Sequence, residues 1–161
     1  MFDRTDLENV ELSEAVFGET TFDKCDLSGV DLSGKDLSNC VVNGSDFARA
    51  DPSGTSFANA DLRGGMFRGA NMGGANLVAA RGEFADFAGA NLGGAKLNGA
   101  RLPRTDFSEA RVAGADFSQC HLGESRFPKS NASGAVFDRA TLHYVDFSHA
   151  NWSVRTSSRQ I

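Results

Sequence analysis

The chain has 161 residues and a formal net charge of −5; 40% of its residues are hydrophobic and 23% are charged. This composition is typical of one folded domain and excludes a disordered chain. No run of eighteen apolar residues predicts a membrane span, and the acidic N-terminal stretch does not resemble a signal peptide, so we expect a cytoplasmic protein.

A block of five residues repeats from Phe2 to Trp152 without a break. Residues 85–100 show it clearly, as ADFAG-ANLGG-AKLNG-A: a small residue comes first, a polar one second, a large apolar one third and glycine last. Twelve of the thirteen phenylalanines occupy the third position, Phe84 being the exception, and twelve of the eighteen glycines occupy the fifth. Neither a helix nor an ordinary strand has this period. Each block is therefore predicted to be a short extended piece that ends in a tight bend.

A chain that bends after every five residues closes a four-sided turn in twenty. The third-position residues support this period, because six phenylalanines follow one another at a spacing of twenty. These residues, which we expect to form a stacked core column, are Phe47, Phe67, Phe87, Phe107, Phe127 and Phe147.

The pattern resembles the pentapeptide-repeat family, whose motif is A-[DN]-L-x-x. Residues 60–64 (ADLRG), 90–94 (ANLGG) and 45–49 (SDFAR) carry the resemblance residue by residue. It implies an all-β fold, a right-handed quadrilateral parallel β-helix of about seven and a half coils. We expect residues 1–152 to form this single domain and residues 153–161 a short C-terminal tail.

Nothing in the sequence predicts catalysis, so we expect no enzyme, no catalytic residue, no metal and no cofactor. The histidines at 121, 143 and 149 are scattered along the repeat. The cysteines at 25, 40 and 120 occupy inward first positions, which favours small buried side chains over disulfides or a zinc site. The glycine pairs lack the lysine and the helix start of a phosphate loop.

A column of second-position acids is the first candidate interaction surface: Asp6, Asp26, Asp46, Asp86, Asp106 and Asp146. One interpretation is a negatively charged rod that imitates the phosphates of DNA. The other is that these residues bond the local backbone, as aspartate often does in turns. Charge also changes along the chain, from −7 over residues 1–50 (eleven acids, four bases) to +2 over residues 101–161 (six acids, eight bases). This distribution counts against a uniform mimic of DNA, unless it is only drift in surface charge.

A second candidate lies where the repeat is irregular. Gly82 leaves a core position empty and Phe84 stands at a corner. An unfilled hole of leucine size costs about 2–5 kcal/mol, so we expect Phe84 to fold inward and fill it. The alternative is a local bulge that exposes Phe84 as a binding anchor together with Arg81 and Glu83.

The ends of a parallel β-helix expose strand edges that must be covered. Trp152, at the last third position, is expected to be a plug or a dimer contact, and we predict C-terminal dimerisation or end-to-end association. The function we expect is a non-enzymatic protein–protein interaction scaffold with an unidentified protein partner. The alternative, implied by the quinolone-resistance branch of the family, is a DNA mimic that inhibits or protects DNA gyrase or topoisomerase IV. Neither interpretation involves direct binding to nucleic acid or to a membrane.

Overall fold

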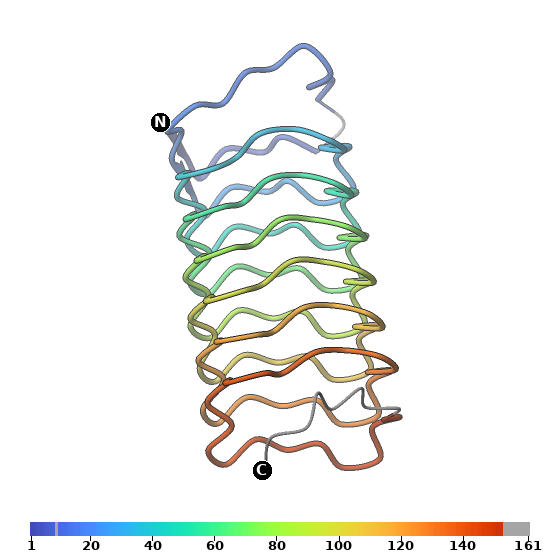
Figure 1. Ribbon diagram of the computed structural model, residues 1–161. Helices are drawn as coiled ribbons and strands as arrows, with labels where there is room; N and C mark the ends of the chain where they lie inside the picture. Colours follow the sequence, from blue (N-terminus) through green and yellow to red (C-terminus); the bar gives the residue numbers. More distant parts are fainter. Residues whose placement is uncertain (9, 153–161) are drawn as a thin grey trace.

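The molecule is a rod of stacked rectangular turns, with the first and the last described residues at opposite ends of the rod (Figure 1). The computed structural model describes residues 1–8 and 10–152. Two short strands, β1 (Phe2–Asp3) and β2 (Phe22–Asp23), pair in parallel. Further along the rod, single parallel bridges join residues twenty positions apart, as far as Asn131 and Asn151. One turn therefore contains twenty residues, as the phenylalanine spacing predicts.

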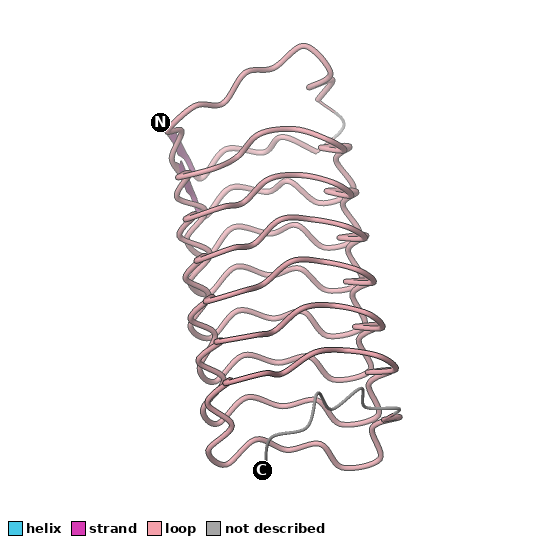
Figure 2. Cartoon of the chain, viewed as in Figure 1, coloured by secondary structure: helices cyan, strands magenta, loops and turns pink. Residues whose placement is uncertain are grey.

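Most of the described chain is drawn as loop because each side of a turn is long enough for one bridge only (Figure 2). None of residues 1–8 and 10–152 is helical. It follows that no helix in this part of the chain is long and apolar enough to cross a membrane. The predicted total of seven and a half coils stays a prediction.

The block at Ala85–Gly89 shows why five residues make one side and one corner. The N–H of Ala90 donates to the carbonyl of Phe87 at 3.0 Å, which closes a β-turn. Gly89, the third residue of that turn, has φ +66°. This left-handed conformation is strained for residues with a Cβ, which explains the glycines at the fifth position.

A regular side, such as the one at residues 85–89, is joined to the next turn by three backbone hydrogen bonds. Phe87 N–H donates to the carbonyl of Asp106 at 2.7 Å, and Asp106 N–H donates back to the carbonyl of Ala85 at 3.1 Å. Gly89 N–H donates to the carbonyl of Ser108 at 2.8 Å. Beyond the first turn, the rod is thus a continuous parallel ladder whose four walls are each only a few residues wide.

The interior is filled by first- and third-position side chains. Successive rings in the phenylalanine column lie nearly parallel, with centroids 4.5–5.1 Å apart from Phe47 to Phe147. Phe117 packs edge-on against two of them, Phe107 and Phe127, both at 5.7 Å. Such stacked and perpendicular contacts are the favoured arrangements of aromatic pairs. The axis of the rod is therefore packed with hydrocarbon.

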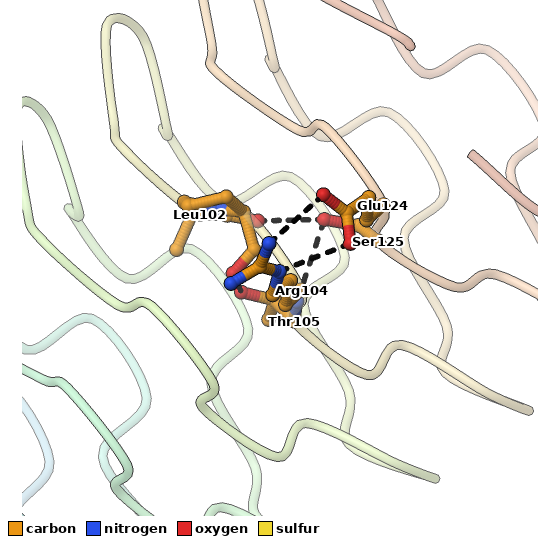
Figure 3. Close-up of polar contacts among 6 residues, drawn as sticks. Leu102, Arg104, Thr105, Glu124 and Ser125 are labelled. Carbon is orange, nitrogen blue, oxygen red and sulfur yellow. Dashed lines mark hydrogen bonds and ion pairs between the residues drawn. The ribbon is translucent and has the colours of Figure 1, made fainter. Parts of the chain in front are cut away.

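Buried hydroxyl groups are accommodated by carbonyls of the preceding turn. Thr105 Oγ1 donates to the carbonyl of Gly82 at 2.9 Å, and Ser125 Oγ donates to the carbonyl of Leu102 at 2.6 Å (Figure 3). At positions 105 and 125 the first-position hydroxyl is therefore tolerated in the core because it is satisfied locally, whereas the buried Oγ of Ser130 has no hydrogen-bond partner among the described residues.

The prediction that Phe84 folds inward is wrong. Its side chain is 61% exposed, and a Cβ built on Gly82 would lie 2.7 Å from Cδ2 of Leu102. The isobutyl group of Leu102, one turn further along, therefore already occupies the space that Gly82 leaves. No bulge forms either, since Ala85 N–H donates to the carbonyl of Gly82 at 3.0 Å, as in every regular block. Phe84 is exposed from a regular corner.

Candidate interaction surface

The six acids of the second-position column follow one another along one wall. Parallel bridges connect Asp6, Asp26 and Asp46, and then Asp86 and Asp106. Met66 and Arg126 interrupt the column, at the bridges Asp46–Met66–Asp86 and Asp106–Arg126–Asp146. The structure therefore brings the predicted acids together, in a discontinuous row.

Each of these aspartates bonds its own backbone. The Oδ1 atom accepts the N–H two residues later at 2.8–2.9 Å in all six, for example from Ser28 to Asp26 and from Ala48 to Asp46. Hydrogen bonds from Ser28 and Ser148 hold the pKa of Asp26 and of Asp146 below the ordinary value. The presence of aspartate in this column is thus explained by local turn structure.

One acid of the column also has a cationic neighbour. The guanidinium of Arg68 lies 2.7 Å from Oδ2 of Asp86 and donates to that oxygen through Nε at 2.8 Å. A basic side chain thus covers part of the acidic row. An uninterrupted track of negative charge is not present on this wall.

The second surface, which we call the 84–144 corner, consists of Phe84, Arg104, Glu124 and Tyr144. These residues occupy the fifth position of the same side in four successive turns, where Gly44 and Gly64 stand in the preceding turns. All four have left-handed backbones, with φ between 55° and 61°. Left-handed residues other than glycine are strained, and for a bulky side chain they are true outliers.

Contacts between neighbours organise the 84–144 corner. Cζ of Arg104 lies 5.6 Å from the centre of the Phe84 ring, within the range of a cation–π interaction. The same guanidinium donates two hydrogen bonds to Glu124, from Nε to Oε2 at 3.0 Å and from Nη2 to Oε1 at 3.1 Å (Figure 3). This bond pair lowers the pKa of the Glu124 carboxyl below its usual value. Arg104 is thus held between an aromatic face and a carboxylate.

The 84–144 corner adjoins a shallow depression of about 320 Å³, lined by Glu83, Phe84, Pro103, Arg104, Gly123 and Glu124. Tyr144 stands beyond it, 91% exposed, and Phe84 is 61% exposed. Arg81 is exposed on the same wall, and bridges place it directly between Asp61 and Arg101 in the stack. Arg81, Glu83 and Phe84, predicted as one group, therefore lie on one side of a single turn.

Sequence reasoning missed Arg104, Glu124 and Tyr144. The signal was present, since these residues follow Phe84 at spacings of twenty, forty and sixty. The same period that reveals the phenylalanine column in the core reveals this column on the surface.

The cysteine and histidine side chains, which could in principle take part in catalysis or bind a metal, are placed unfavourably for either role. All three cysteines are buried as free thiols, and burial raises the pKa of Cys120 to about 12. The histidines at 121, 143 and 149 are exposed and separate. Within residues 1–8 and 10–152, no three histidine, cysteine or acidic side chains gather as a metal site would require.

Trp152 lies at the far end of the core. Its ring centroid is 4.2 Å from that of Phe147 and 5.4 Å from that of Phe137, and the side chain is half-buried. This is the position of a plug over the last rings. The tail predicted at residues 153–161 lies outside the described residues.

The family model for pentapeptide repeats matches the chain in eight copies, at residues 2–34, 36–74, 85–123 and 115–151. A comparison with curated proteins finds no match. Among solved structures, a trypsin-treated variant of QnrB1, a plasmid-mediated fluoroquinolone resistance protein, is 25% identical with a TM-score of 0.52, over 93% of this chain and 88% of that one. Rfr23, a pentapeptide repeat protein from the cyanobacterium Cyanothece 51142, is 20% identical with a TM-score of 0.49, over 91% and 98%.

Proposed function

This chain belongs to the pentapeptide-repeat family, and from that premise we propose that it is a non-enzymatic scaffold that binds a protein partner through the 84–144 corner. In this proposal residues 1–152 form a single right-handed, four-sided β-helix of about seven and a half coils in the cytoplasm. The packed axis leaves only the outer walls and the two ends for binding.

The observation that carries the proposal is the presence of two exposed aromatic residues, Phe84 and Tyr144, at left-handed corners where glycine would be unstrained. Each such residue costs folding free energy, on the order of 1–3 kcal/mol, without filling the core. Exposed aromatic rings next to arginine are the side chains that dominate protein–protein binding energy. A strained, exposed aromatic corner is therefore better explained by binding than by stability.

The test compares matched variants in affinity capture from the source organism. The corner variant carries Phe84→Gly and Tyr144→Gly. The control carries Ala79→Gly and Gln119→Gly, which relieve the same left-handed strain at another corner. We expect a specific protein that the wild-type chain and the control retain and the corner variant loses. If the corner variant retains every protein that the control retains, the 84–144 corner is not the docking surface.

A second candidate is a protein that binds DNA gyrase or topoisomerase IV as a DNA mimic. The similarity to a fluoroquinolone resistance protein, over most of both chains, favours it. The interrupted column and the Arg68–Asp86 pair count against it. A supercoiling assay with and without a fluoroquinolone decides between the two. This candidate requires inhibition or drug protection at micromolar protein, and the lack of either effect removes it.

A further inference from the structure

The first turn of the rod is not fully joined to the second. On two of its four sides the chain rises away from the stack (Figure 1). Among the described residues, no backbone hydrogen bond joins residues 10–19 to residues 31–38, although the corresponding sides of the next two turns are joined, for example by Leu32 N–H to the carbonyl of Asp51 at 2.9 Å. Three bonds are missing on each side, so an open parallel strand edge runs along residues 31–38.

Lys35 explains the separation. It occupies an inward first position, where Thr55, Ala75 and Ala95 stand in the following turns, and it is the only charged residue at a first position between Phe2 and Trp152. Ala15 would lie directly above it at about the strand spacing of 4.8 Å in a closed turn. The Lys35 ammonium instead donates to the carbonyl of Ser13 across the gap. The side chain thus spans the gap and holds residues 10–19 above the edge, so a strand that pairs with residues 31–38 must displace the ammonium from Ser13.

The edge is surrounded by acids. Hydrogen bonds from Ser33 and Ser38 lower the pKa of Asp31 and Asp36, so both carboxylates are ionised at neutral pH. Glu11 and Glu14, exposed, face solvent on the raised segment. An extended segment that pairs with this edge should therefore be basic and free of acids.

Residues 153–161 have this composition. The segment SVRTSSRQI contains Arg155 and Arg159, no acid and no proline, and it supplies the whole +2 charge of residues 101–161, because residues 101–152 contain six acids and six bases. Nine extended residues span about 30 Å, enough to follow an eight-residue edge.

The segment of the same molecule is too far away. Trp152 and Leu32 differ by 120 residues, which is six turns of twenty, so they lie about 29 Å apart along the rod at the strand spacing. Residues 153–161 would be used up in covering that distance, so they could not also pair with the edge of their own molecule. We propose that the open edge at residues 31–38 takes residues 153–161 of a second copy of this chain as an added parallel strand.

The experiment measures self-association by sedimentation velocity over a range of concentrations. We expect a salt-sensitive association that weakens at least tenfold in a chain truncated after Trp152, and equally in Arg155→Glu/Arg159→Glu. The control is Lys129→Glu/Arg139→Glu, which changes the net charge by the same amount on exposed side chains outside the segment. The control should associate like the wild type.

Charge exchange identifies the surface that receives the segment. Asp31→Lys/Asp36→Lys should abolish association, and combining it with Arg155→Glu/Arg159→Glu in one chain should restore it. Association should also slow hydrogen exchange at the amides of Asp31 and Asp36. A wild-type chain that stays monomeric, or a truncated chain that associates as strongly as the full one, would overturn the inference. Phe84→Gly should leave this association unchanged, so its outcome is independent of the 84–144 corner.

Discussion

The guanidinium of Arg104 lies over the ring of Phe84, 5.6 Å from its centre, although the two residues are separated by a full turn of the chain. The contact exists because both residues occupy the same corner in successive turns, and both have left-handed backbones that glycine would adopt with less strain. Stability and binding therefore make opposite demands on this corner, and substitutions can separate them.

Replacing Phe84 by glycine should stabilise the protein. The left-handed strain disappears and no core contact is lost, so we expect the free energy of unfolding to rise by about 1 kcal/mol. Denaturant unfolding measures the change. Ala79→Gly, at an equivalent left-handed position with φ 57°, is the matched control and should give a similar gain. A loss of stability in Phe84→Gly alone would mean that the ring supports the fold.

The ion pair at the same corner should be visible in a titration. Arg104 lowers the pKa of Glu124 from its ordinary value of 4.5, so the pair stabilises the fold above that pH and the contribution is lost as the pH falls through the lower, folded pKa. Because both side chains are exposed, the effect on stability should be small. NMR titration of the Glu124 carboxyl should show a midpoint that rises toward 4.5 in Arg104→Gln. An unchanged midpoint would show that the pair is not populated in solution.

The effects on stability of substitutions at Gly82 and Leu102 should be coupled. Gly82→Ala should destabilise, because the new Cβ would lie 2.7 Å from Leu102 Cδ2. Leu102→Ala should cost about 2–5 kcal/mol through the cavity it leaves. In the double variant the added methyl meets the vacated space, so the loss should be smaller than the sum of the two. Thermal unfolding of the four proteins in this cycle measures the coupling, and strict additivity would contradict it.

The fold could be predicted because its periods are written in the sequence. Third-position residues from Phe2 to Trp152 give the five-residue side, and the phenylalanines from Phe47 to Phe147 give the twenty-residue turn. Both follow from backbone geometry that repeats without insertions.

The outward orientation of the Phe84 side chain could not be predicted from the same reasoning. The empty position at Gly82 suggested that the nearest spare ring would fill it, but Leu102, twenty residues away, fills it from the neighbouring turn. Which of two turns supplies a side chain depends on rotamers that periodicity does not encode. The separation of the first turn is a similar case. The sequence shows Lys35 as a charged residue at an inward position, but it does not show which segment moves away from the stack.

Positions in the acidic column should tolerate loss of the carboxylate charge better than loss of the Oδ1 acceptor. Asp46→Asn keeps an Oδ1 acceptor for the N–H of Ala48, which lies 2.8 Å away, whereas Asp46→Ala leaves that N–H without its partner. We expect Asn to be nearly neutral and Ala to cost about 1 kcal/mol in thermal unfolding. Equal losses for both variants would show that charge, and not the local bond, is what the position requires. In the supercoiling assay only a DNA mimic should be sensitive to Asn substitutions along the column.

A single substitution at Lys35 should change the course of the backbone in the first turn. In Lys35→Ala the inward position becomes small, as in most other blocks, so residues 10–19 can close onto residues 31–38 and form the missing ladder. Six backbone bonds at net values near 1 kcal/mol each, reduced by the lost bond to Ser13 and by the ordering of the segment, should still raise the free energy of unfolding by at least about 1 kcal/mol. Hydrogen exchange at the amides of Leu12 and Asp36 should slow, while Lys24→Ala, at an exposed corner, should change neither quantity. Closure would also remove the edge that the second copy's segment needs, so self-association should fall in the same variant. If exchange at Asp36 is as fast in Lys35→Ala as in the wild type, the lysine is not what holds the first turn open.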